Sequence, residues 1–444
     1  MASNETPTKK STKVLVCLLR ILVGATFVVS GLSKSIDIWG FTYKIEHYLM
    51  VWGMDVSRPL VMLGASVLSY TEFLLGVFVL FGCYRRVSVW LSSALMLFMT
   101  AFSVYMVAVD PVADCGCFGE LMQVPNAVTL LKNLALCAAL VYLLLTNRKV
   151  KGFYNTYLHW VVGLFSILYI ILVGYFGIAA QPLLDFRDFK VETPLFDDEA
   201  ANVDVIYEKN GETRKFTADN LPDSTWTFVD VANDADARLS LSVFAGVEEG
   251  DELTDSVASL ADNLILVSIP EIEKAPKSAI AKIQRLKEFC DGKNIHFVVV
   301  SGSGADAVEN WRRLSLNKYD ILTADDTTLE ALVRGEVGVV YVKDNLIKWK
   351  YTLDLIASDD MDEIMELGSI ESAVFIVLTI GYLLALLILK IIDFTGRRLK
   401  PVFFGKRKKA ETEASASDEI GESDTAEQVA DTAGNEQQQT TDDK

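Results

Sequence analysis

Six long apolar runs constrain this chain more than any other feature of its sequence. They cover residues 14–33, 59–82, 87–109, 127–146, 157–180 and 372–392. A helix needs about 20 apolar residues to cross a bilayer, and each run has roughly that length. One soluble core could not bury so much apolar sequence. We therefore predict a polytopic α-helical membrane protein that sits in a lipid bilayer.

The positions of Lys and Arg predict how these spans are oriented. Three cations precede the first span, two separate the second from the third, three follow the fourth and seven lie at residues 397–409 after the last. The short connections on the opposite side, residues 34–58 and 110–126, hold only Lys34, Lys44 and Arg58. Short cytoplasmic connections are enriched in Lys and Arg. We therefore expect both termini in the cytoplasm and residues 181–370 exported.

Overall charge excludes one class of partner. The net charge is −18 and the isoelectric point is near 4.7. Such a chain offers no broad basic face for phosphates, so we expect no nucleic-acid partner. Residues 1–13 and 393–444 are predicted to be cytoplasmic, and the second segment, basic and then acidic, is expected to be disordered.

Charged residues inside the predicted spans are candidates for function, because burying a charge in hydrocarbon is costly. Arg20 in the first span and Glu72 in the second lie at similar depths, counted from the cytoplasmic side. We therefore predict that these two residues form an intramembrane ion pair. Two roles stay open for this pair: a structural contact that fixes helix register, or a proton relay.

The loop between the third and fourth spans carries the sequence's most distinctive chemistry. Cys115 and Cys117 are separated by Gly116, on the side predicted to be oxidising. Gly116 permits the kink that would let the two sulfurs meet, and so small a ring should be strained and easily exchanged. Lys132, six residues into the fourth span, either extends its ammonium to the interface or lends positive charge to this loop.

Three interpretations of the cysteine pair remain open. The pair exchanges electrons with a partner protein or a membrane quinone, it forms a static bridge or two free thiols, or it binds a metal. A metal would need Asp114 or Glu120 as a further ligand, because the loop contains no His, and we therefore predict no metal site.

Residues 14–146 resemble the DoxX/MauE group of bacterial membrane proteins. The resemblance is carried by Leu19-Arg20, by Ser30-Gly31-Leu32-Ser33-Lys34, by Glu72 and by the CGCFG motif at residues 115–119. It implies a four-helix bundle in the bacterial inner membrane, similar in plan to disulfide-generating quinone reductases. It also implies thiol–disulfide redox chemistry or the maturation of exported partner proteins. A membrane quinone is then the candidate cofactor. The chain lacks the second outside cysteine pair that a complete relay would use.

Residues 263–370 show an α/β pattern that resembles the thioredoxin fold. Strands are expected at 263–268, 295–300, 338–343 and 346–351, with helices at 277–290, 305–316 and 361–367. Ser268 and Glu271 occupy the two positions where a thioredoxin-like reductase carries CxxC. Neither side chain can supply a thiolate, so we expect this domain to be redox-dead. Residues 181–262 are expected to form a β-rich lobe.

Two functions follow from these observations, besides a small-molecule or ion carrier whose pathway would be the Arg20–Glu72 pair. The first is a thiol–disulfide or quinone-linked oxidoreductase that acts through Cys115 and Cys117, with the exported domain positioning an envelope protein. The second is a non-enzymatic membrane scaffold, whose redox-dead thioredoxin-like domain binds an envelope protein.

Overall fold

Six helices long and apolar enough to cross a bilayer form the membrane part, which confirms the six predicted spans. The computed structural model describes residues 10–109, 119, 121, 124–147, 150–187, 189–196, 204–209, 212–217, 226–231, 257, 259–316, 319–356 and 371–396. The spans are α1 (Lys10–Ile36), α3 (Arg58–Phe81), α4 (Val87–Val109), α5 (Asn126–Thr146), α6 (His159–Ala179) and a final helix, Glu371–Gly396.

Glycines bring α1 and α3 into close contact. A Cβ on Gly31 would lie 2.4 Å from the backbone nitrogen of Phe73, and one on Gly76 would lie 2.6 Å from that of Val28. Small residues let membrane helices approach until their backbones nearly touch. This packing holds Glu72, which lies beside Phe73, against α1.

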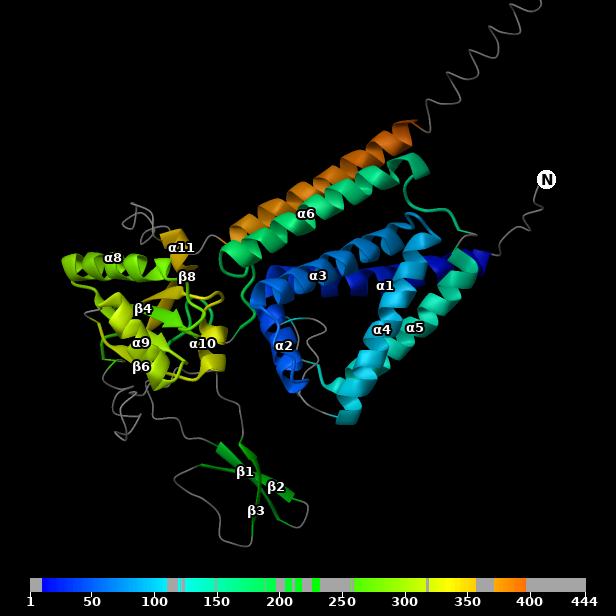
Figure 1. Cartoon of the computed structure of the whole chain (residues 1–444). Coiled ribbons are helices and arrows are strands. Elements are labelled where there is room, and N and C mark those ends of the chain that lie inside the picture. Colours follow the sequence, from blue (N-terminus) through cyan, green and yellow to red (C-terminus); the bar gives the residue numbers. More distant parts are fainter. Residues whose placement is uncertain are drawn as a thin grey trace, which may run out of the picture.

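A short helix that the sequence pattern did not predict follows α1. This helix, α2 (Ile38–Val51), begins at Asp37, whose side chain accepts a hydrogen bond from the Gly40 N–H. Figure 1 shows α2 running away from α1 and α3 toward one end of α4. Just beyond its last residue, the indole of Trp52 donates a 2.9 Å hydrogen bond to the Tyr105 hydroxyl of α4. We call this end of the bundle the α2 end.

The last span packs against α6 (Figure 1). The rings of Tyr169 and Tyr382 stack with centroids 4.4 Å apart, and the Tyr382 hydroxyl lies 2.9 Å from that of Ser166. These two helices lie side by side along α3. α6 packs against Phe73 and Val77 of α3.

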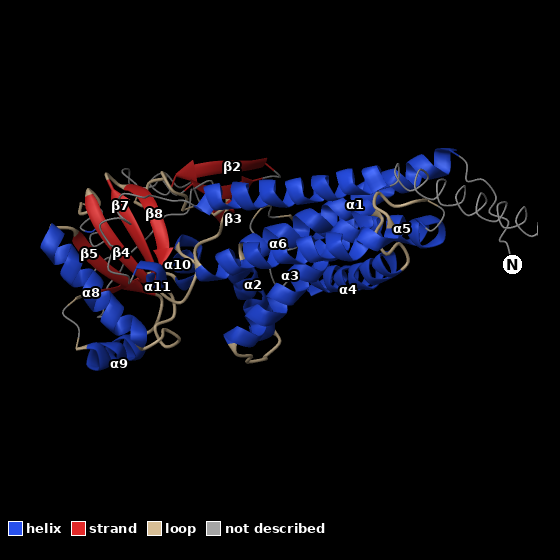
Figure 2. Ribbon diagram, turned by 90° about the horizontal axis from the view of Figure 1, so that it is seen from above, coloured by secondary structure: helices blue, strands red, loops and turns tan. Residues whose placement is uncertain are grey.

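The α/β domain adjoins the α2 end of the bundle and contains a five-stranded mixed sheet. The strand order is β6 (Ile321–Thr323), β5 (His296–Ser301), β4 (Asn263–Ile269), β7 (Gly338–Lys343) and β8 (Leu346–Thr352). β4 is parallel to β5, β5 is parallel to β6, and β7 is antiparallel to both β4 and β8. Figure 2 shows this sheet with its flanking helices.

Alternating side chains of β4 serve two separate cores. Ile265, Val267 and Ile269 pack with α8 (Ser278–Lys293) and α9 (Ala305–Ser315), whereas Leu264 and Leu266 pack toward α10 (Asp326–Leu332). This period of two is that of a strand buried on both faces. The domain ends, in its described part, with α11 (Leu353–Ile356).

The structure bears out most of the predicted α/β elements. The four predicted strands and the helices expected at 277–290 and 305–316 are all present. The hairpin turns at Asp344 and Asn345, whose φ angles are 52° and 58°. β6 and α10 were not predicted, and the helix expected at 361–367 lies outside the described residues.

The lobe predicted at 181–262 is described only in part. It contains a small antiparallel sheet in the order β2 (Glu212–Thr217), β1 (Asp204–Lys209) and β3 (Thr227–Val231). Alternating apolar residues at 203–207 and 226–231 predict two of these strands, and the structure contains them as β1 and β3. A third alternating stretch, at residues 239–244, lies outside the described residues.

Candidate functional site

A buried ion pair joins α1 to α3 in the membrane part. Lys34 Nζ lies 2.6 Å from Glu72 Oε2, and the two side chains are 2% and 9% exposed. The same ammonium donates a 3.0 Å hydrogen bond to Ser30 Oγ and lies 5.4 Å from the centre of the Phe41 ring. A charge pair this deep is expensive to bury, so its presence marks a candidate site.

The end of the CGCFG motif lies close to the backbone of Ser33 and Lys34. Gly119, the last residue of the motif, is buried. A Cβ at this position would lie 3.6 Å from the Ser33 carbonyl oxygen and 3.7 Å from the Lys34 nitrogen. Its φ of 59° is in the left-handed region, where glycine is favoured. Three motifs that lie far apart in the sequence therefore meet here: SGLSK at residues 30–34, Glu72 and the end of CGCFG.

The predicted redox residues themselves are not placed. Cys115, Gly116 and Cys117 lie outside the described residues, as do Asp114 and Glu120. No group of three or more metal-ligating side chains occurs among the described residues. Lys132 is half-buried on α5. Beside it, Asn133 Nδ2 donates a 2.8 Å hydrogen bond to Ser103 Oγ of α4.

The predicted ion pair between Arg20 and Glu72 is wrong. Arg20 instead binds the Asn147 side chain, with Nε 2.6 Å from Oδ1, and three backbone carbonyls at residues 147, 150 and 151. Its guanidinium lies beside Gly82, where a Cβ would be 2.8 Å from Nη1. Gly82 is ten residues beyond Glu72 along α3, or about 15 Å at 1.5 Å per residue. The partner of Glu72 is Lys34, which the sequence pattern placed in a loop.

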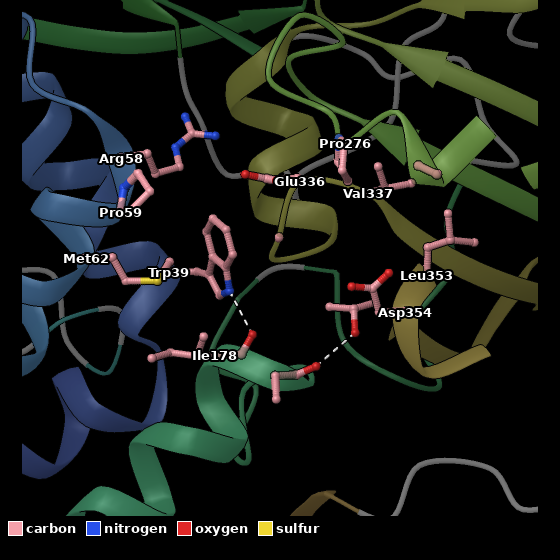
Figure 3. Close-up of a pocket in the computed structure, with 14 residues that line it drawn as sticks. Trp39, Arg58, Pro59, Met62, Ile178, Pro276, Glu336, Val337, Leu353 and Asp354 are labelled. Carbon is pink, nitrogen blue, oxygen red and sulfur yellow. Dashed lines mark hydrogen bonds between the residues drawn. The ribbon is translucent and has the colours of Figure 1, made fainter. Parts of the chain in front are cut away.

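A cavity of about 330 Å³ lies where the α/β domain meets the α2 end of the bundle. Figure 3 shows Trp39 and Met62 on the bundle side facing Val337 and Leu353 on the domain side. The Trp39 indole donates a 3.0 Å hydrogen bond to the Ile178 carbonyl, which ties α2 to the end of α6.

Ion pairs fix this junction at two points. Arg334, at the end of α10, binds Asp37 with an Nη2–Oδ2 distance of 2.8 Å, and both side chains are buried. Arg58, the first residue of α3, binds Glu46 of α2 and Glu271 of the α/β domain. Burial alone would raise the pKa of Glu271, but hydrogen bonds from Lys274 and Arg58 hold that pKa below its usual value.

Ser268 and Glu271, which stand at the positions of the two CxxC cysteines in the sequence comparison, have different surroundings. Ser268 is fully buried in β4 and its hydroxyl has no hydrogen-bond partner among the described residues. Glu271 follows the strand and faces the membrane part, where it contacts Arg58. The segment that resembles a degenerate thioredoxin motif thus contacts the bundle. Its packing against α3 could not be foreseen, because α2 and the junction were not predicted.

The six apolar helices, the buried Lys34–Glu72 pair and the adjoining domain define a multi-pass membrane protein with an α/β domain at one end of its bundle. Residues 12–146 match the family model for methylamine utilisation protein MauE, so the first four spans form a MauE-like membrane domain. A domain of unknown function (DUF8463) matches residues 203–234. No curated protein matches the chain, and no solved structure matches it.

Proposed function

We propose that this protein is a thiol–disulfide oxidoreductase of the bacterial inner membrane that matures exported partner proteins through Cys115 and Cys117. The observation that carries the proposal is the burial of Gly119 near the backbone of Ser33 and Lys34. Gly119 follows Cys117 by two residues in the sequence, and Lys34 is a buried lysine. A cation near a thiol favours the thiolate, which is the form that attacks a disulfide.

The proposed reaction transfers two electrons. A disulfide between Cys115 and Cys117 accepts them from a dithiol in an exported partner, which becomes a disulfide, while Cys115 and Cys117 become thiols. A membrane quinone then oxidises these thiols and leaves as the quinol with two protons. Lys34 supports the thiolate in both steps, and Glu72 balances the lysine charge in the apolar surroundings.

The proposed orientation places the cysteine loop and residues 181–370 on the exported side. The excess of Lys and Arg in the connections at the opposite end supports this orientation. Disulfides persist on that side of a bacterial membrane and are rare in the cytoplasm, so the direction of the reaction depends on the orientation of the protein.

Trapping the redox state in cells tests the proposal. Cells are quenched with acid, alkylated with a maleimide of known mass and analysed before and after quinone synthesis is blocked. We expect Cys115 and Cys117 to be oxidised with quinone available and alkylated without it. Cys17→Ser is the matched control, because Cys17 is a single exposed cysteine in α1 and should not change the cycle. A pair that stays in one state under both conditions contradicts the proposal.

We further propose that the α/β domain is a redox-dead relative of thioredoxin. Its sheet order, with β7 antiparallel to its neighbours, supports this relationship. The contact of Glu271 with Arg58 favours a second function, in which the domain is a fixed scaffold element on the bundle and the chain has no redox activity. The variant Cys115→Ser distinguishes the two functions, because it abolishes partner maturation only if the protein is the oxidoreductase.

A further inference from the structure

A second cavity lies at the end of the bundle opposite α2, where α1 begins and α3 ends. Its volume is about 390 Å³, and its lining comes from the turn after α3 and from the segment between α5 and α6. The lining includes Gly82, Arg85, Lys151, Asn155 and Thr156. The lining is polar and cationic although it lies at the ends of membrane-spanning helices.

Two of the lining side chains are cations. Arg85 is half-buried, and its Nη1 donates a 2.9 Å hydrogen bond to the Val150 carbonyl, which holds the guanidinium at the wall of the cavity. Lys151 is exposed and has no ion pair among the described residues. The carboxylate that approaches the lining is that of Asp393, which contacts Asn155. Asp393 is fully buried and is balanced by Lys390 at 3.7 Å.

Arg20 positions the segment that carries Lys151. Its guanidinium donates to the carbonyls of Asn147, Val150 and Lys151 at 3.1, 2.9 and 3.0 Å. These carbonyls follow the last turn of α5, where unsatisfied oxygens attract a cation. Arg20 therefore fixes the shape of the cavity wall and adds a third positive charge behind it.

Exposed aromatic side chains surround the same end of the bundle. Trp and Tyr concentrate where a membrane protein crosses the lipid headgroups. Six aromatic side chains are at least two-fifths exposed here: Tyr84 (41%), Trp90 (63%), Phe153 (49%), Tyr157 (51%), Trp160 (63%) and Phe394 (52%). They place the cavity at headgroup depth, where the available anions are lipid phosphates.

We propose that this cavity binds a phosphate group, and that its source is the headgroup of an anionic phospholipid. Basic pockets between membrane helices bind such headgroups. Arg85 and Lys151 supply the charge, and Asn155 and Thr156 border the site with polar groups. Free phosphate carries the same chemistry, so the test must separate the two sources.

The test uses the purified full-length protein, with bound lipid measured by native mass spectrometry and thermal stability measured in parallel. The probes are phosphatidylglycerol, phosphatidylethanolamine and inorganic phosphate, each added separately. The double variant Arg85→Gln/Lys151→Gln should retain about tenfold less phosphatidylglycerol than the unmodified protein. Lys13→Gln/Arg86→Gln is the matched control, because it removes the same charge from exposed cations outside the cavity lining.

Lys151→Glu serves as a second variant in case the loss of Arg85 disturbs folding. It alters an exposed side chain and should weaken phosphatidylglycerol retention more than either control substitution does alone. Binding of phosphatidylglycerol without an effect of inorganic phosphate supports the lipid as the source. If inorganic phosphate stabilises the unmodified protein but not the double variant, the cavity is a phosphate site whose ligand is soluble. That result supports the site and contradicts the lipid source. Equal retention by the double variant and its control, or equal retention of both lipids, would overturn the proposal.

Discussion

Arg334 and Asp37 form a buried ion pair between the α/β domain and the membrane bundle, although 297 residues separate them in the sequence. Arg334 Nε lies 3.1 and 3.0 Å from the two carboxylate oxygens, and Nη2 lies 2.8 Å from one of them. Asp37 also caps α2. One carboxylate thus starts a helix and holds a second domain in place.

Replacing this carboxylate with an amide should weaken the junction. Asp37→Asn keeps the shape of the side chain but removes the carboxylate charge from a buried ion pair with Arg334, which typically costs about 3–5 kcal/mol. We expect a lower melting temperature of the purified protein and faster proteolysis of the α/β domain. The control is Asp354→Asn, which breaks a pair with Lys282 in which Asp354 is 75% exposed. Equal effects of the two substitutions would show that the junction does not depend on Asp37.

Removing one charge of the Lys34–Glu72 pair should affect stability differently from removing both charges. Glu72→Gln leaves the Lys34 ammonium unpaired in the membrane, so we expect a marked fall in yield and melting temperature. The double variant Lys34→Met/Glu72→Leu removes both charges and should keep the fold, because apolar replacement of a buried pair is often neutral. Melting curves of the detergent-solubilised protein measure both effects.

The double variant also tests the proposed role of Lys34. If Lys34 supports the thiolate as proposed, loss of its ammonium should slow oxidation and reduction of Cys115 and Cys117 about tenfold, as measured by alkylation at timed intervals. A double variant that folds and cycles at the original rate would remove Lys34 from the mechanism.

Glu330 on α10 should make the stability of the α/β domain depend on pH. Burial raises the pKa of Glu330 to about 7, although Arg334 and Arg58 oppose this. The folded state therefore holds a proton that the unfolded state releases above its ordinary pKa of about 4.5, so stability falls as pH rises from there through about 7. Glu330→Gln should raise the melting temperature more at pH 8 than at pH 5.

Tryptophan fluorescence melts of the full chain at the two pH values measure this difference. Glu309→Gln is the control, because Glu309 lies exposed on α9. If the melting temperature of Glu330→Gln differs from that of the original protein by the same amount at both pH values, Glu330 does not titrate as described.

The membrane spans could be predicted because their signal is local. A span needs only a run of apolar residues, and α4 begins and ends at the predicted residues, Val87–Val109. Strands β4, β5, β7 and β8 were also predictable, because a short apolar run between turn residues suffices. α2 was missed because 14 residues are too few for a span, and its buried face is set by contacts with α3, α6 and the α/β domain.

The ion pairs could not be predicted, because they depend on how helices align. Counting residues from the cytoplasmic ends of the two predicted spans gives Arg20 and Glu72 similar depths. The count did not include the extension of α1 to Ile36, which turns Lys34 from a loop residue into a helical one facing α3. Arg20 is drawn instead to the carbonyls beyond α5, a partner that no local pattern reveals. The contact of Gly119 with Ser33 likewise depends on tertiary structure alone.

The most direct test of the proposed function is the redox state of Cys115 and Cys117 in intact cells. Acid-quenched alkylation followed by mass spectrometry of the peptide that contains both cysteines reports that state. The oxidoreductase proposal predicts a disulfide that is reduced when quinone synthesis is blocked and forms again when quinone is restored. A peptide whose mass is the same under all three conditions would contradict it.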